Sequence, residues 1–180
     1  MGRWLAIMCV RGSVACYFGY VVGELVSNPS RRCLLWQRRL WSLGAVLLLV
    51  HILLAFAYFH DGSHASAIRE TARQTEALIG IAWGGGVYVN EVFVALWLLD
   101  AALMWLPRAQ RGGSSLAATA VRRWRVARHG VAGFMMFNAT VVFGPPFWRW
   151  LVPLAVVALF IVHRCTSNSG HPVSNSADRS

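Results

Sequence analysis

The chain has 180 residues, of which 57% are hydrophobic and 13% are charged, and its mean hydropathy is +0.50. The charged residues lie between long apolar runs, which excludes an ordinary soluble domain and is typical of a multi-pass helical membrane protein. All 17 basic residues are arginines, and a net charge of +10 would suggest nucleic-acid binding in a soluble protein. Because these arginines gather between apolar runs, membrane topology explains them better, and we expect no nucleic-acid partner.

We predict an all-α fold, with one transmembrane helical domain over residues 1–164 and a disordered Ser/Asn-rich tail over residues 165–180. A helix needs about 20 apolar residues to cross a bilayer, and shorter spans occur. About five apolar segments fit this requirement, at residues 4–22, 41–59, 79–106, 131–145 and 147–163. The chain should therefore form a bundle of transmembrane helices embedded in a lipid bilayer.

The first predicted span, residues 4–22, is the least regular, because Arg11 interrupts it and glycines lower its helix propensity. Ala15, Gly19 and Gly23 are spaced four apart and predict one small-residue face for close helix packing in a bilayer. A secretory signal peptide is the alternative reading. Since no clear small-x-small cleavage site precedes a polar region, we expect a retained helix.

The segment between the second and third spans is polar. Residues 60–64 predict a turn, in which Asp61 or Ser63 would cap a short amphipathic helix over residues 65–79 on the outer membrane face. The glycines at 84–86 predict either an irregular start of the third span or a close approach of another backbone. Residues 121–129 predict a basic amphipathic helix on anionic headgroups or, equally, a solvated loop.

Two arginine clusters indicate the membrane topology. The first cluster contains Arg31, Arg32, Arg38 and Arg39, and the second contains Arg108, Arg111, Arg122, Arg123, Arg125 and Arg128. The segment between the second and third spans is instead slightly acidic. By the positive-inside rule, we expect both clusters and the C-terminus in the cytoplasm, and the N-terminus outside.

Ionisable residues within the spans are costly in hydrocarbon and are candidates for function. His51 and Glu91 lie at similar predicted depth in neighbouring spans, with Asn90 as a polar neighbour, and we predict that they form an intramembrane pair. Such a pair could relay protons or bind a transported ion, or it could only fix helix register. Asp100 lies nine residues beyond Glu91 on the opposite side of the helix, which favours a structural contact with a cytoplasmic arginine.

His60, Asp61 and His64 are the candidate metal ligands. Two histidines four residues apart on a helix can chelate zinc or copper, with a carboxylate as a third ligand. Gly62 lies between them, and two or three ligands do not complete a site. Together with His51, they could also contact different parts of a haem, although no second pair of histidines on the same side supports this.

No catalytic motif is recognisable, which favours a non-enzymatic protein over an enzyme. A histidine-bearing span, an HxxxH loop and a Gly-rich span with Asn90 and Glu91 resemble uncharacterised bacterial multi-pass proteins, which implies the bacterial inner membrane but no activity. We expect a small accessory or scaffold subunit that binds a membrane-protein partner or a second copy of itself. The alternatives are a transporter or proton-handling protein using His51 and Glu91, and a metal or haem protein.

Overall fold

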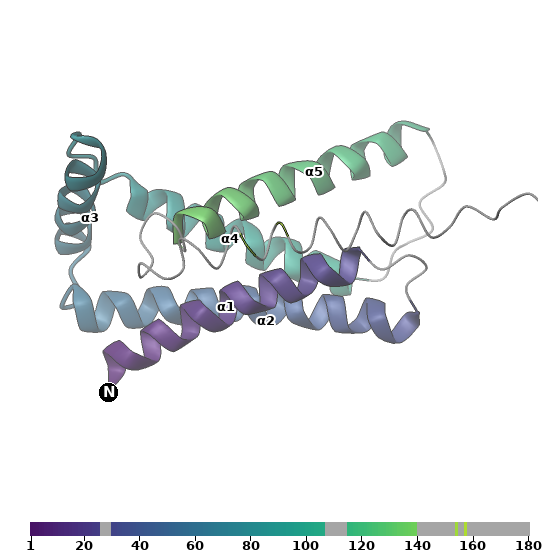
Figure 1. Cartoon of the computed structure of the whole chain (residues 1–180), viewed down its shortest axis with the longest axis horizontal. Helices are drawn as coiled ribbons and strands as arrows, with labels where there is room; N and C mark the ends of the chain where they lie inside the picture. Colours follow the sequence, from purple (N-terminus) through teal and green to yellow (C-terminus); the bar gives the residue numbers. More distant parts are fainter. Residues whose placement is uncertain (26–29, 107–114, 140–153, 155–156, 158–180) are drawn as a thin grey trace, which may run out of the picture. The chain divides into compact units, whose positions relative to one another are not determined.

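The computed structural model describes residues 1–25, 30–106 and 115–139, together with Leu154 and Val157. Within these ranges the chain contains helices and turns but no strand, which confirms the predicted all-α class (Figure 1). The helices are α1 (Gly2–Glu24), α2 (Arg31–Phe59), α3 (His64–Ile79), α4 (Gly86–Trp105) and α5 (Ser115–Phe137). By length and composition, α1, α2 and α4 are each able to cross a membrane.

The chain divides into two compact units, residues 1–117 and 118–180. The first unit holds α1 to α4. In the second, α5 continues without a break from the basic segment at 121–129 into the apolar segment that follows it. The predicted spans at 131–145 and 147–163 lie mostly outside the described residues, and the tail at 165–180 lies wholly outside them.

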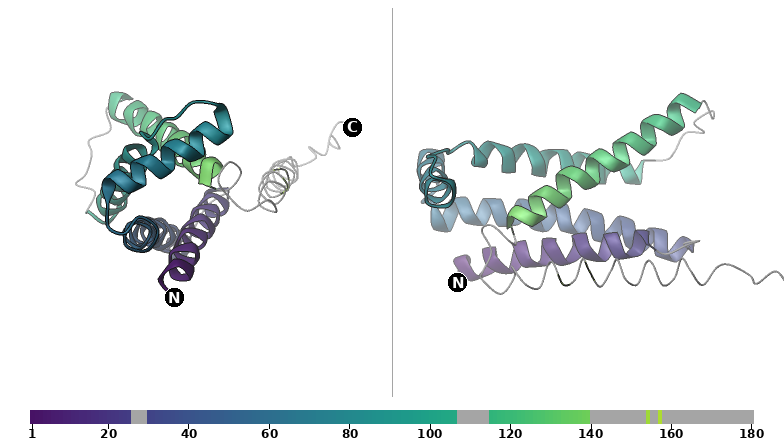
Figure 2. Two further views of the ribbon diagram at one scale, coloured as in Figure 1. Left: turned by 90° about the vertical axis from the view of Figure 1, so that its left-hand side faces the viewer. Right: turned by 45° about the horizontal axis from the view of Figure 1, so that its top comes forward.

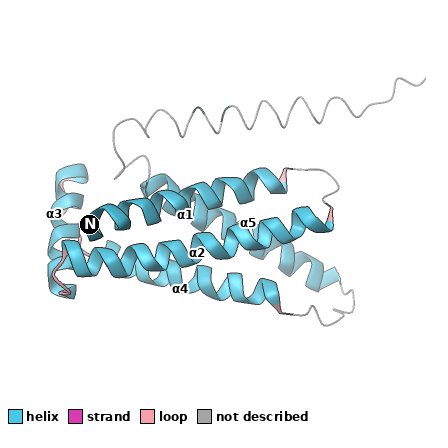
Figure 3. Cartoon of the chain, turned by 90° about the horizontal axis from the view of Figure 1, so that it is seen from below, coloured by secondary structure: helices cyan, strands magenta, loops and turns pink. Residues whose placement is uncertain are grey.

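In the first unit, α1 and α2 form an antiparallel pair (Figure 3). Five of the seven buried positions of α1 follow one another at intervals of three, four, three and four residues, a period of 3.5 that keeps one stripe facing a neighbouring helix. These positions are Ala6, Cys9, Ser13, Cys16 and Tyr20. Because most of their side chains are small, the two backbones approach closely, as expected for helices that associate in a bilayer.

The predicted small-residue face of α1 is only partly the one that packs. Cβ atoms built on Gly19 and Gly23 would lie 3.2 Å from Leu40 Cδ1 and 2.9 Å from Gln37 Cγ of α2. Ala15, in contrast, is exposed. A strict spacing of four drifts by about 40° per step around a helix, so it leaves the interface after two turns. The packed stripe alternates four and three instead.

Helix α2 begins ten residues before the span predicted at residues 41–59. Ser30 caps it, since its Oγ accepts a hydrogen bond from the Cys33 N–H at 3.2 Å. The segment 31–39 is rich in arginine and leucine, which are good helix formers, so the first arginine cluster is helical. The whole helix has 29 residues and is about 43 Å long, which exceeds the hydrocarbon thickness of about 30 Å.

Helix α3 starts at a cap provided by Ser63, one of the two predicted caps, and lies across the ends of α2 and α4 (Figure 2). Gly80 ends it in the left-handed conformation, with φ of 74°. Residues 80–85 are not helical, so α4 begins seven residues after the start of the span predicted at residues 79–106. Thr75 Oγ1 holds this loop, because it lies 3.1 Å from Trp83 N and 2.8 Å from Trp83 O.

The glycines at 84–86 were expected either to start the span irregularly or to let another backbone approach, and they do both. This glycine run lies in the irregular segment that leads into the helix, and it also approaches another backbone. A Cβ on Gly84 would lie 2.7 Å from Ile68 O of α3. Any side chain at Gly84 would therefore push the start of α4 away from α3.

An aromatic cluster joins α1, α2 and α4. Trp41 of α2 is 1% exposed, and its ring lies 5.1 Å from that of Trp97 in α4. Tyr20 of α1 also contacts Trp41, with ring centres 4.6 Å apart and ring planes tilted by 48°. Helix α2 therefore contacts α1 through one face and α4 through another, and it is the central helix of the first unit.

Candidate functional site at the junction of α2, α3 and α4

A tight turn places the first residue of α3 against α4. Asp61 and Gly62 adopt positive φ values of 50° and 70°, a conformation that aspartate and glycine tolerate. The Gly62 N–H donates to Phe56 O at 2.8 Å and closes the end of α2. The chain then reverses into α3, so that His64 lies beside the second turn of α4.

His64 and Glu91 form the central contact of this site. His64 Nε2 lies 3.0 Å from Glu91 Oε1, and the two side chains are 42% and 36% exposed. A neutral imidazole donates one hydrogen bond here, and a protonated one adds an ion pair with the carboxylate. Phe56 and Tyr88 flank the His64 ring, with centres at 5.5 Å and 5.2 Å. The contact therefore joins the first turn of α3 to the second turn of α4.

The predicted pair of His51 and Glu91 does not form. His51 Nδ1 lies 2.9 Å from Ala6 O, so this histidine faces α1 rather than α4. Since α4 begins only at Gly86, Glu91 is about 8 Å from the end of its helix, whereas His51 is about 12 Å from Phe59. Counting a continuous span from residue 79 placed Glu91 too deep.

The predicted metal ligands His60, Asp61 and His64 do not converge. His60 is the C-cap of α2 and His64 is the first residue of α3, so they do not share one helix face. His64 contacts Glu91, while the exposed Asp61 lies in the turn. Over the described ranges, no three His, Cys, Asp or Glu side chains are arranged to hold a metal ion. The geometry thus gives no support to a zinc, copper or haem site at these residues.

The remaining predicted residues lie on α4. Asn90 is exposed next to Glu91, and Asp100 is buried, with 7% of its surface exposed. Asp100 lies close to Trp97 and Ala101 in sequence, on the buried side of α4. A contact between Asp100 and a cytoplasmic arginine stays a prediction.

The sequence contained an unused signal for the contact between His64 and Glu91. Tyr88 and Glu91 are three residues apart and share one face of α4. The cap at Ser63 fixes where α3 begins and so places His64 at its first turn. Starting α4 after the glycine run would have placed Glu91 at the helix end, at the same level as this turn.

Polar side chains elsewhere in the first unit connect helices. Ser13 Oγ of α1 donates to Gly44 O of α2 at 2.8 Å in a buried position, and His51 contacts the backbone of α1 in the same way. Trp105 Nε1 of α4 donates to Ser42 Oγ of α2 at 2.8 Å. Each of these contacts links two neighbouring helices, and such bonds fix helix register in a bilayer.

No protein-family model matches the chain, and no curated protein or solved structure is significantly similar to it. Functional reasoning therefore rests on geometry and chemistry. Two features of the first unit bear on it: the His64–Glu91 contact at one end, and the polar contacts that link its helices.

Proposed function

We propose that this chain is a multi-pass membrane protein that serves as an accessory or scaffold subunit, and that α4 binds a helix of another subunit. The observation that carries this proposal is an exposed apolar stripe along α4, here called the α4 stripe. It consists of Val89, Val92, Leu96, Leu99 and Leu103, each at least 41% exposed.

The spacing of the α4 stripe suits a neighbouring helix. Its residues follow one another at intervals of three, four, three and four, the 3.5-residue period of helices that pack knobs into holes. A face with this spacing can pack against a second helix along its whole length. The opposite side of α4, with Phe93, Val94 and Trp97, is already buried in the first unit.

A scaffold role also agrees with how the first unit uses its polar groups. Ser13 and His51 bond the backbone of a neighbouring helix, and Ser42 bonds Trp105. A transport path needs polar groups that face a water-filled route and exchange partners with a substrate. These three groups instead hold helices together, which supports a packing and partner-binding role.

The membrane placement forms part of this proposal. Five spans, an outer N-terminus, a cytoplasmic C-terminus and the bacterial inner membrane are the expected arrangement, with α3 on the outer face. The charge distribution supports it, because the arginines of α2 lie at the opposite end of the helix from α3, which carries Glu70 and Glu76. Alkaline phosphatase fused within α3 should be active, and fused after residue 180 it should be inactive. The reverse pattern would contradict the orientation.

Cysteine cross-linking tests the partner-binding role. In a background with Cys33 and Cys165 replaced by serine, Leu99→Cys should form a cross-linked adduct in native membranes, and the mass of the adduct distinguishes a second copy from another protein. Leu53→Cys is the matched control, since Leu53 is 60% exposed on α2, away from the α4 stripe. Equal adduct yields at both positions, or none at Leu99, would contradict the proposal.

The contact between His64 and Glu91 favours proton handling as a second candidate function. Its 3.0 Å separation and partial exposure allow a proton to be exchanged with water at the membrane edge. Glu91→Gln keeps the shape of the side chain but removes its charge. In vesicles with an internal pH-sensitive dye, this variant should abolish proton flux that the wild type supports, with Glu70→Gln on α3 as the control. Unchanged flux would exclude this role.

A further inference from the structure

We propose that the first turns of α2 form a binding site for the headgroup of an anionic phospholipid. This site, here called the arginine face, consists of Arg31, Arg32, Arg38 and Arg39 together with Trp36. The inference rests on the proposed membrane placement. It adds a defined ligand class at one end of the first unit.

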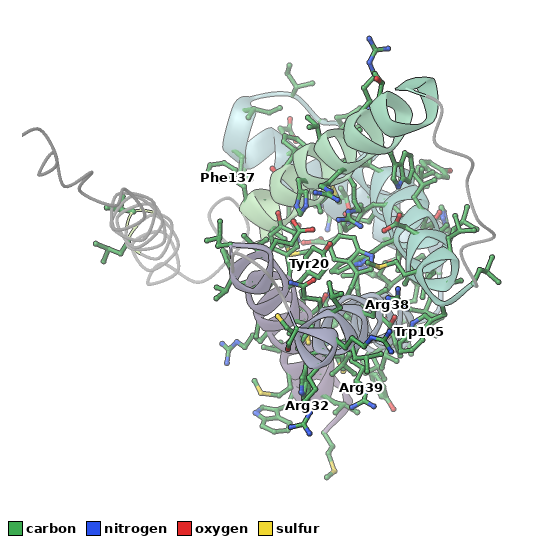
Figure 4. The ribbon with its side chains drawn as sticks, turned by 90° about the vertical axis from the view of Figure 1, so that its right-hand side faces the viewer. Tyr20, Arg32, Arg38, Arg39, Trp105 and Phe137 are labelled. Atoms are coloured by element: carbon green, nitrogen blue, oxygen red, sulfur yellow. The ribbon has the colours of Figure 1, made fainter. Side chains whose placement is uncertain are left out.

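Helix geometry places the four arginines on one side of α2. Arg31 and Arg38 are seven residues apart, as are Arg32 and Arg39, and seven residues bring a helix back to within about 20° of the same direction. The four side chains therefore share an arc of about 120°. Figure 4 shows three of them, Arg32, Arg38 and Arg39, gathered at the end of the unit where Trp105 also lies.

The arginine face lacks a protein counter-charge. None of its four guanidinium groups forms an ion pair with a described acidic residue. The chain has seven acidic residues, and Asp61, Glu70, Glu76 and Glu91 belong to the opposite end of the first unit. At the same end, Glu24 accepts a hydrogen bond from Tyr20 at 2.6 Å. The four guanidinium groups of the arginine face are therefore free of ion pairs with the described acidic side chains and can bind an external anion.

Aromatic residues indicate the level of the arginine face relative to the bilayer. Trp105 bonds Ser42, and Tyr58 and Tyr88 lie near the other ends of α2 and α4. The rise from Ser42 to Tyr58, and from Tyr88 to Trp105, is about 25 Å, which is close to the hydrocarbon thickness between two aromatic belts. Arg38 lies one turn beyond Ser42, so its guanidinium reaches the level of the headgroup phosphates.

The side chains of the arginine face suit a phospholipid headgroup. A guanidinium group binds phosphate through two parallel hydrogen bonds. Arg39 Cζ lies 5.6 Å from the centre of the Trp36 ring, a cation–π contact that restricts this guanidinium, and Trp36 itself is 61% exposed. Leu34 and Leu35, each 44% exposed, add apolar surface for the start of an acyl chain. A choline headgroup adds a cation next to the arginines, so net-negative headgroups are favoured over zwitterionic ones.

Native mass spectrometry of the purified full-length protein tests this inference. In detergent supplemented with phosphatidylglycerol or phosphatidylcholine, the wild type should retain phosphatidylglycerol at least tenfold more strongly. Arg38→Gln with Arg39→Gln should remove this preference, because each arginine near a membrane surface contributes about fivefold to anionic-lipid binding. Arg69→Gln with Arg73→Gln is the matched control, since both arginines are exposed on α3. Equal retention of the two lipids by the wild type, or equal loss in both double variants, would overturn the inference.

Two further measurements separate the possible outcomes. Inorganic phosphate at the same concentration should leave the bound phosphatidylglycerol in place, and displacement would mean that the site holds a free anion instead. Alkaline carbonate extraction shows whether each variant is inserted in the membrane. If the wild type is extracted, the proposed membrane placement fails; if it stays inserted without lipid preference, only the lipid site fails. Arg32→Gln with Arg39→Gln provides a second variant should the first not insert.

Discussion

The two faces of α2 pack against their neighbours by different means. Towards α1, the contact is made mainly by small residues and by side chains bonded to backbone, such as Ser13 Oγ with Gly44 O at 2.8 Å, and Tyr20 contacts Trp41 at one end of it. Towards α4, the contact is made by large aromatic rings, with Trp41 and Trp97 at 5.1 Å, and by one exposed hydrogen bond between Trp105 and Ser42. The α1–α2 contact depends on room for the two backbones to approach. The α2–α4 contact depends on large side chains that fill the space between the helices.

This difference predicts opposite sensitivities on the two faces. Helices in a bilayer gain little from hiding apolar surface from each other, since lipid is equally apolar, so close fit and interhelical bonds carry their association. A contact built on small residues should be harmed by added atoms. A contact built on aromatic rings should be harmed by removed atoms. Gly44 belongs to both contacts, because an added Cβ would meet Trp97 and Cys16.

Removing the Trp97 side chain should have the largest effect. Trp97 is 2% exposed and fills the space between α2 and α4, so Trp97→Ala leaves a cavity that helix shifts fill only partly. We expect a loss of about 3–5 kcal/mol of unfolding free energy, the range for large-to-small changes at buried aromatic residues. Titration with sodium dodecyl sulfate in mixed micelles, followed by far-ultraviolet circular dichroism, measures this loss.

The control for this prediction is Trp4→Ala on α1. Trp4 is 64% exposed, so its removal should change the unfolding free energy by less than about 1 kcal/mol. A similar loss in both variants would show that the aromatic cluster has no special role in the α2–α4 contact.

Adding volume at Gly44 should have the second-largest effect. A Cβ there would already lie 3.0 Å from Trp97 Cζ2 and 3.2 Å from Cys16 Cβ, and a leucine adds three further carbons. We expect Gly44→Leu to lower the unfolding free energy by about 2–3 kcal/mol, as overpacking does in well-packed cores. Because Cys16 is buried beside Gly44, its reaction with a maleimide should become faster in this variant, in a background with Cys9 replaced by alanine and with Cys33 and Cys165 replaced by serine.

Leu43→Phe adds atoms to the neighbouring residue, which is 50% exposed. Its unfolding free energy and its Cys16 labelling rate should both stay close to the wild-type values. Faster labelling in Leu43→Phe as well would mean that the space around Gly44 does not control the α1–α2 contact.

Local signals predicted much of this architecture from the sequence. Apolar length indicated helices at α1, α2 and α4, and Asp61 or Ser63 was expected as the cap of α3, of which the structure has Ser63. Helix caps and apolar runs depend on residues close in sequence, so they can be read without the fold. The start of α2 was missed because charge was taken as the end of the helix, although arginine is a good helix former.

The partners of His51 and Glu91 could not be predicted in the same way. Their contacts depend on how each helix is rotated about its axis and on where α4 begins, and both follow from packing with other helices. Six residues of loop between Ile79 and Gly86 shifted Glu91 towards the helix end, where it meets His64. The packed stripe of α1 was missed for a related reason: the residues around it are equally apolar, so nothing in the sequence marks the side of the helix that packs.

Removing the hydroxyl of Ser13 tests the polar part of the α1–α2 contact. Ser13 is fully buried, and its bond to Gly44 O fixes the register of the two helices. We expect Ser13→Ala to lower the unfolding free energy by about 0.6–1.7 kcal/mol, the range of interhelical hydrogen bonds in membrane proteins. The same detergent titration measures this change. No change would indicate that the small-residue fit alone sets the register.

The smallest effect is expected for the hydrogen bond on the α4 face of α2. Trp105 is 49% exposed, so water or a lipid headgroup can replace Ser42 as the partner of its indole N–H. Trp105→Phe should therefore lower the unfolding free energy by no more than about 0.5 kcal/mol, and Ser42→Ala by a similar amount. If the bond accounts for both losses, the double variant should lose no more unfolding free energy than either single variant. A double-mutant cycle measures this coupling. Fully additive losses would show that the bond does not couple the two helices, and would leave the aromatic cluster as their main contact.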